Sequence, residues 1–204
     1  MSKKIIFATI ALQRKDQLKK LAYHRENTQQ CYPIASAFPS IPVMEESLCD
    51  GDDVTIIPII TEDTFGNSRN NLEVFREELA EMNRRHGWQL QLSDPIIIPH
   101  EETKPKQVQL FREFCDRYEE NAEIYMDVTY GTKITAIGIF STLVYAERVK
   151  NCNIRSIIYG KFLHDAENTG EIYDIRPLYN LNMLISALDP GCGDVNALLN
   201  ALWR

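Results

Sequence analysis

The stretch EIYMDVTYGTKITAIGIFSTLVYAERV, from Glu123 to Val149, decides the fold. Its opening residues Ile124–Val128 are β-branched, aromatic and apolar, which is typical of a short buried strand. Thr129-Tyr130-Gly131 then predicts a tight turn, and a long apolar helix begins at Thr132-Lys133. The sequence therefore predicts a strand, a turn and a helix in immediate succession.

This turn is a candidate anion site. A helix that begins in this way points unpaired backbone N–H groups and the positive end of its dipole at the space above the strand. Lys133 adds a full charge in the first helical turn. The motifs G-x-x-x-x-G-K-[ST] and G-x-G-x-x-G are both absent, so neither of these phosphate loops is encoded. A capped turn without any ligand uses the same residues, and the turn alone leaves that interpretation open.

The composition is that of an ordinary globular domain. The chain has 204 residues, of which 44% are hydrophobic and 25% charged. It contains no apolar run of about 20 residues, and its first residues do not resemble a signal peptide, so we expect no membrane segment and a cytoplasmic location. Five scattered cysteines without C-x-x-C and four isolated histidines predict free thiols, no metal site and no cofactor.

The charge is unevenly distributed. The net charge is −7, yet residues 1–40 hold seven Lys or Arg against Asp16 and Glu26, a local balance of +5. This asymmetry permits a local anion site and disfavours binding of duplex nucleic acid. A solvated, Lys-rich helix face would have the same composition.

The remaining chain alternates strands and helices. Further strands are predicted at Lys3–Ala11, Asp53–Thr61, Pro95–Pro99, Ile154–Gly160 and Ile172–Ile175. Pro58 suggests an edge strand or a bulge for the second of these. A short basic helix is predicted at Gln13–Ala22, and a second helix is capped by Asn67 or Ser68, ends at Gly87 and has the apolar stripe Leu72, Phe75, Leu79 and Met82. A third helix is capped by Thr103, has Pro105 in its first turn and has the apolar stripe Val108, Phe111, Cys115 and Tyr118. Two further helices are predicted near the C-terminus, one ended by Asp189-Pro190-Gly191 and marked by Leu178, Leu181, Leu184, Ile185 and Leu188, and one at Val195–Arg204. Residues 23–51, with three prolines, are predicted to form an extended excursion, with room for a short helix.

This order predicts an α/β fold: a Rossmann-like, mostly parallel sheet with helices on both faces. In such sheets ligands bind at the carboxyl ends of the strands, where the winding direction reverses. Thr9 and the Thr129–Lys133 turn both lie at carboxyl ends, so they share one pocket if their strands are neighbours. The helix that begins at Lys133 has almost no polar face before Glu147, which suggests that a second copy covers it in a homodimer.

These features resemble the CRISPR-associated Rossmann-fold (CARF) sensor domain. The resemblance rests on the D-V-T-Y-G-T-K run at Asp127–Lys133, the opening strand that ends near Thr9, the excursion after Tyr23, and Tyr159-Gly160 followed by Ile172–Ile175 and a Leu-rich helix. It covers nearly the whole chain, and the Asp127–Lys133 run is its specific part. Domains of this family form homodimers that bind cyclic oligoadenylate across the two-fold axis and switch an attached effector domain.

The resemblance implies a site and its ligand. Gly131, Thr132 and Lys133 would hold phosphate, Thr129 and Tyr130 would shape the turn, and Thr9, Ile10, Ala11, Leu12 and Gln13 would form the first ligand loop. The family often has Gly or Ser where Ala11-Leu12-Gln13 stand here, which weakens the assignment of the first loop. The ligand would be cyclic tetra- or hexa-adenylate, and Tyr23, Asn27 and Tyr32 are candidates to contact adenine.

The resemblance also implies a domain organisation. The sensor would span residues 1–190, and residues 191–204 would be a C-terminal helix or a linker toward an effector domain. None of the four histidines fits the R-x(4–6)-H motif of the family's usual ribonuclease partner. The abrupt end at Trp203-Arg204 favours the sensory part of a larger protein over a stand-alone sensor.

Two other functions stay open. Some family members cleave the bound ring through its ribose 2′-hydroxyl, and Lys133 and Thr9 would then be the groups that assist. A Rossmann-like domain that binds a mononucleotide or a phosphorylated metabolite is the third candidate, and it predicts one ligand per monomer.

Overall fold

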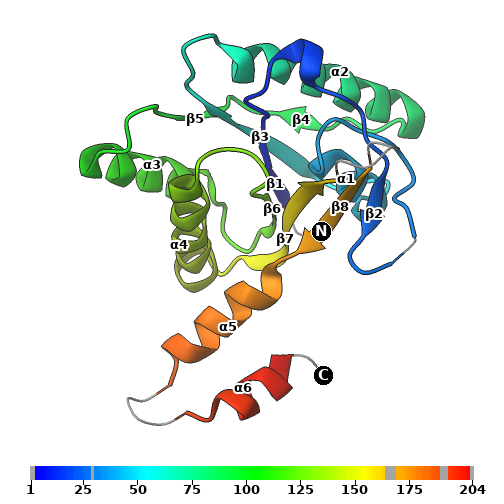
Figure 1. Cartoon of the computed structure of the whole chain (residues 1–204). Helices are drawn as coiled ribbons and strands as arrows, with labels where there is room; N and C mark the ends of the chain where they lie inside the picture. Colours follow the sequence, from blue (N-terminus) through cyan, green and yellow to red (C-terminus); the bar gives the residue numbers. More distant parts are fainter. Residues whose placement is uncertain (1–2, 29, 164–168, 189–192, 203–204) are drawn as a thin grey trace.

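The computed structural model describes residues 3–28, 30–163, 169–188 and 193–202 (Figure 1). The sheet contains β1 (Lys4–Thr9), β2 (Tyr23–Arg25), β3 (Val54–Thr61), β4 (Gln91–Leu92), β5 (Ile96–Ile98), β6 (Glu123–Asp127), β7 (Asn153–Phe162) and β8 (Gly170–Asp174). The helices are the 3₁₀ turn η1 (Lys15–Gln17), α1 (Ser40–Ser47), α2 (Asn67–His86), α3 (Lys104–Arg117), α4 (Lys133–Lys150), α5 (Arg176–Ser186) and α6 (Val195–Leu202). The predicted α/β class is confirmed.

The sheet is mostly parallel. In the described residues its strand order is β2-β8-β7-β6-β1-β3-β4, with β5 also paired to β3, and the β7–β8 pair is antiparallel. The chain winds from β1 to β3 on one side and returns to place β6 on the other side of β1. The winding therefore reverses between β1 and β6, which is where ligands bind in sheets of this kind.

Both faces of the sheet carry a core, because successive side chains of each strand point to opposite faces. Ile5 and Phe7 of β1 pack with residues of α3, α4 and α5, whereas Ile6 and Ala8 pack with residues of α1 and α2. Figure 1 shows α5 and α6 extending away from the sheet at the C-terminal end. No helix of the described segments is both long and apolar enough to cross a membrane.

The predicted helix pattern is confirmed for α2. Leu72, Phe75, Leu79 and Met82 are all buried, and Gly87 ends the helix with a left-handed conformation (φ 71°). The cap differs from the prediction, because Gly66 precedes the helix and the carboxylate of Asp63 accepts the backbone N–H groups of Phe65, Asn67 and Ser68.

Two predictions for the first half of the chain are wrong. Residues 13–22 form only the three-residue 3₁₀ turn η1 rather than a basic helix, because Leu21 pairs with Ser36 in an isolated bridge and too few apolar residues remain to bury a helix face. Pro58 lies in an interior strand and not at an edge, and β3 pairs with β1 through Pro58 without a bulge. Pro58 is tolerated because β4 pairs with residues 55–56 and β5 with residues 59–61. The strand pairing on this side of β3 is therefore interrupted beside Pro58.

Two predicted apolar stripes are only partly covered. In the stripe of α3, Cys115 and the C-cap residue Tyr118 are buried, but Val108 and Phe111 are 53% and 38% exposed. On α5, the buried residue is Tyr179, and Leu178 and Ile185 face solvent. The periodicity was sufficient to predict the helices but not what would cover each face. The predicted stop Asp189-Pro190-Gly191 lies outside the described residues; α5 ends at Ser186.

The cysteines of the described segments are free thiols. Cys115 and Cys152 are buried, whereas Cys31 and Cys49 are exposed. Cys192 lies outside the described residues. Burial raises the pKa of Cys115 to about 11, so this thiol is unreactive at neutral pH.

Candidate ligand-binding site

The two predicted ligand segments meet at the carboxyl edge of the sheet. β1 and β6 are parallel neighbours, with Lys4 to Phe7 in register with Glu123 to Met126. Beyond the paired residues, the backbone N–H of Tyr130 donates to the hydroxyl of Thr9 at 3.0 Å. The two strands are therefore neighbours, and the two predicted ligand segments are in direct contact.

The turn from Asp127 to Lys133 has the predicted geometry. Gly131 has a φ of 110°, which favours glycine, and the hydroxyl of Thr132 caps α4 by accepting the backbone N–H of Thr135 at 3.2 Å. The amides of Gly131 and Thr132 donate to no atom of the described residues. Lys133 is exposed and has no ion-pair partner in that part of the chain. The start of α4 thus presents free N–H donors and one free cation.

A buried carboxylate lies beneath this turn. Asp127 is 1% exposed, and its Oδ1 accepts the backbone N–H of Thr129 at 2.8 Å. Burial raises the pKa of Asp127 to about 6, and the hydrogen bonds from Thr129 together with the nearby hydroxyls of Thr9 and Ser40 oppose that rise. Oδ2 has no hydrogen-bond partner of good geometry among the described residues.

The excursion is attached to the same turn through Tyr130. The Tyr130 hydroxyl donates to the carbonyl of Ala37 at 2.9 Å, and its ring contacts those of Phe38 and Phe162, with centroids 6.4 and 5.7 Å away. The hydroxyl of Thr129 accepts the backbone N–H of Gly160 at 2.8 Å. Residues 36–39, the turn and β7 are therefore held together at one edge.

The predicted site residues differ in accessibility. In the first loop Thr9, Ile10 and Ala11 are buried, so a ligand can reach the side chains of Leu12 and Gln13 more easily. In the turn, Gly131 and Lys133 are exposed and Thr129, Tyr130 and Thr132 are half-buried. Of the candidates for adenine contact, Tyr23 is fully buried, which removes it from a surface role.

The remaining two candidates for adenine contact, Asn27 and Tyr32, lie on the hairpin that follows β2. The Arg25 guanidinium lies 4.6 Å from the centre of the Tyr32 ring. Asp127 and Ala37 were not among the predicted site residues. Asp127 carries a signal in the sequence, a carboxylate at the end of an apolar strand, but the contact of Ala37 is made by its backbone and leaves no signal.

A substitution at Gly160 can test how closely the excursion approaches the turn. A Cβ at this position would lie 2.3 Å from Cγ of Pro39, so Gly160→Ala is expected to lower the free energy of unfolding by about 1–3 kcal/mol through overpacking. Gly138→Ala is the matched control, because its Cβ would meet nothing within 4 Å and alanine favours a helix by up to about 1 kcal/mol. Denaturant unfolding measures both; equal stability of the two variants would contradict the close contact.

No protein-family model matches this chain, and no curated protein matches its sequence.

Proposed function

We propose that this chain is a sensor of cyclic oligoadenylate, which binds the ring across the two-fold axis of a homodimer. The observation that carries the proposal is the contact between Thr9 and Tyr130, because it joins two segments at the point where the winding of the sheet reverses. The CARF-like Asp127–Lys133 run lies at this point.

The charges of the site suit a small cyclic anion. Such a ring carries one phosphodiester charge per nucleotide, and each chain offers the free amides of Gly131 and Thr132 and the cation of Lys133. The net charge of −7 disfavours a long nucleic acid, which needs an extended cationic surface. A local anion site on an acidic protein favours a compact ligand.

An uncovered apolar surface supports the homodimer. Ile137 of α4 is 68% exposed and lines two grooves, one of about 430 Å³ between α3 and α4 and one of about 440 Å³ beside α5. Ile134, Val108 and Phe111 extend this surface. A second copy related by a two-fold axis can seat its Ile137 in the groove of the first and receive the first in return. The N-termini of the two α4 helices, one from each chain, would then belong to the same dimer.

Binding across such an interface gives a route to regulation. A ring held by both chains stabilises one arrangement of the two subunits, and an attached effector domain would respond to that arrangement. Cleavage of the ring has no specific support here, because the Thr9 hydroxyl is buried and already accepts the Tyr130 N–H.

Calorimetric titration with cyclic tetra- and hexa-adenylate, beside linear oligoadenylate, tests the proposal. One ring should bind per two chains, and Lys133→Ala should weaken binding by more than about 100-fold, since each ring loses two charged contacts. Lys150→Ala, at the opposite end of α4, is the control and should bind as the unaltered chain does. Absence of binding to either ring would overturn the proposal, and one mononucleotide per chain would favour the metabolite-binding alternative.

A further inference from the structure

We propose that Asn71 and Glu78 of α2 are positioning residues that hold both ligand loops at the carboxyl edge of the sheet. The ligand named in the test rests on the proposed function above, but the positioning itself does not. Neither residue belongs to the first loop, the turn or the excursion, and both reach these segments from a helix.

Polar residues form a stripe on the buried side of α2. Ser68, Asn71 and Glu78 are 0%, 0% and 5% exposed, and their spacing of three and seven residues places them on one helix face beside Phe75. A carboxylate and an amide buried on a helix face are costly unless their hydrogen bonds are made. The hydrogen-bond partners of these side chains therefore show which segments the side chains hold.

Asn71 holds the first ligand loop. Its side-chain N–H₂ donates to the carbonyl of Ala11 at 2.9 Å and to that of Gln13 at 2.7 Å. The hydroxyl of Ser68 lies 3.4 Å from the carbonyl of Ile10. The loop from Ile10 to Gln13 is thus fixed through its backbone, which leaves its outer side free for a ligand.

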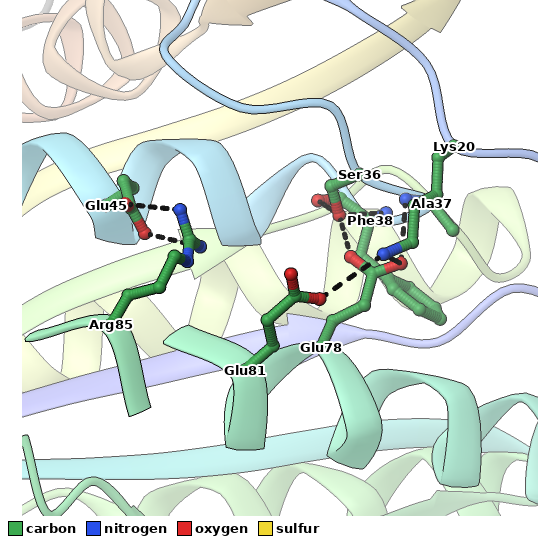
Figure 2. A network of polar contacts seen from close by, with 8 residues as sticks. All are labelled: Lys20, Ser36, Ala37, Phe38, Glu45, Glu78, Glu81 and Arg85. Atoms are coloured by element: carbon green, nitrogen blue, oxygen red, sulfur yellow. Dashed lines mark hydrogen bonds and ion pairs between the residues drawn. The ribbon is translucent and has the colours of Figure 1, made fainter. Parts of the chain in front are cut away.

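Glu78 holds the excursion, as Figure 2 shows. Its carboxylate accepts the hydroxyl of Ser36 at 2.5 Å and the backbone N–H of Ala37 at 3.3 Å. The Ser36 hydroxyl in turn accepts the N–H of Phe38 at 2.9 Å. One buried carboxylate therefore organises three consecutive residues.

These contacts reach the turn through one residue. The Ala37 N–H donates to Glu78, and the Ala37 carbonyl accepts the Tyr130 hydroxyl. The Tyr130 N–H continues the chain to Thr9. Because each link is a hydrogen bond between buried or half-buried groups, a change at Glu78 should alter the position of Tyr130 and thereby of the anion site.

Lys20, from the basic segment of residues 1–40, also joins this network. The ammonium of Lys20 lies 3.8 Å from Glu78 and 3.7 Å from Glu81, so the buried carboxylate faces a half-exposed cation (Figure 2). Arg85 binds Glu45 of α1 through two hydrogen bonds of 2.9 and 3.1 Å, which fixes α1 against α2. The helix that carries the polar stripe is therefore anchored independently of the loops.

The test compares Glu78→Ala, Glu78→Gln and Asn71→Ala with two exposed neighbours on α2, Glu77→Gln and Asn70→Ala. Amide hydrogen exchange without ligand is the first measurement. Glu78→Ala should raise the exchange rates of Ala37, Phe38 and Tyr130 by at least about 10-fold, the ratio that corresponds to about 1.4 kcal/mol. Asn71→Ala should do the same at Ile10 and Tyr130.

A positioning role predicts two further results. Glu78→Gln keeps an acceptor for the Ala37 N–H, so it should restore most of the protection that Glu78→Ala loses. Exchange in β1 and β6 should stay slow in every variant, whereas a general loss of stability would raise it there too. Unchanged exchange at Ala37 in Glu78→Ala, or no rescue by Glu78→Gln, would overturn the proposal.

Ring affinity is the second measurement. Glu78→Ala and Asn71→Ala should each weaken binding by about 10-fold or more, and the two exposed controls should leave it unchanged. Glu78→Ala and Tyr130→Phe act through the same residue, Ala37, so their effects should be clearly non-additive; strict additivity would overturn the link. If the unaltered chain binds no ring, the proposed function fails and the exchange data still decide the positioning role.

Discussion

Ile137→Glu is expected to convert the proposed homodimer into monomers and to weaken ring binding by at least about 100-fold. Ile137 is 68% exposed in the single chain, so the substitution should not disturb the fold. In a dimer, however, the new carboxylate would enter an apolar groove of the partner, where an unpaired charge costs several kcal/mol. Sedimentation measures the subunit state, and calorimetry measures the affinity.

Val149→Glu provides the matched control. Val149 is 60% exposed on the same helix, but it lines neither of the two grooves. This variant should remain dimeric and bind the ring normally. A monomeric unaltered chain, or an Ile137→Glu monomer that binds one ring per chain with full affinity, would contradict binding across a two-fold axis.

Most of the fold follows from local patterns in the sequence. The apolar run of β1, the periodicity of α2 with its stop at Gly87, and the Thr-Gly turn before α4 each depend on residues close together in the chain. Local information is sufficient for these features. The proximity of Thr9 to Tyr130 was predicted only on the condition that their strands are neighbours, and the structure supplies this pairing between segments 121 residues apart.

Features that depend on distant partners were not predictable in this way. Leu21 pairs with Ser36 across the excursion, and this long-range bridge prevails over the weak helix signal of residues 13–22. Pro58 is tolerated because the neighbouring strand is interrupted, which no pattern around Pro58 shows. Asn71 and Glu78 did carry a signal, namely polar residues on the apolar face of a helix, but their partners lie 41 to 60 residues away.

Asp127 gives the second large prediction, because its carboxyl group is buried and forms no ion pair within the described residues. The groups around its carboxylate are the amide and hydroxyl of Thr129, the hydroxyls of Thr9 and Ser40, and the phenol of Tyr23, whose pKa is raised first by burial and then by this carboxylate. Tyr23 Oη and Ser40 Oγ make no hydrogen bond within the described residues. The site therefore stabilises the charged form poorly.

The sign of the pH dependence follows from the raised pKa. Well below pH 3.8 the carboxyl is protonated in the folded and unfolded states alike, and its stabilising contribution is fully present. As the pH rises from about 4 to about 6, the unfolded state ionises while the folded state stays protonated, so the free energy of unfolding falls. The rise from 3.8 to about 6 corresponds to about 3 kcal/mol lost by pH 7.

Asp127→Asn should remove this dependence. Asparagine keeps an acceptor for the Thr129 N–H and adds donors that the free hydroxyls of Tyr23 and Ser40 can accept. The variant should match the unaltered chain near pH 4 and exceed its stability at pH 7 by up to about 3 kcal/mol. Asp127→Ala, which leaves the Thr129 N–H without its acceptor, should be less stable than Asp127→Asn at both pH values by about 1–3 kcal/mol.

Denaturant unfolding of the three proteins between pH 4 and 7 measures these differences. Asp52 and Asp63 have lowered pKa values. Their contributions to the free energy of unfolding therefore change in the opposite direction and are lost as the pH falls. Both residues are common to all three proteins, so their contribution cancels when the variants are compared at each pH. Parallel stability curves for the unaltered chain and Asp127→Asn would show that the carboxylate beneath the turn is not held in its neutral form, and the free amides above it would then lie over a permanent negative charge.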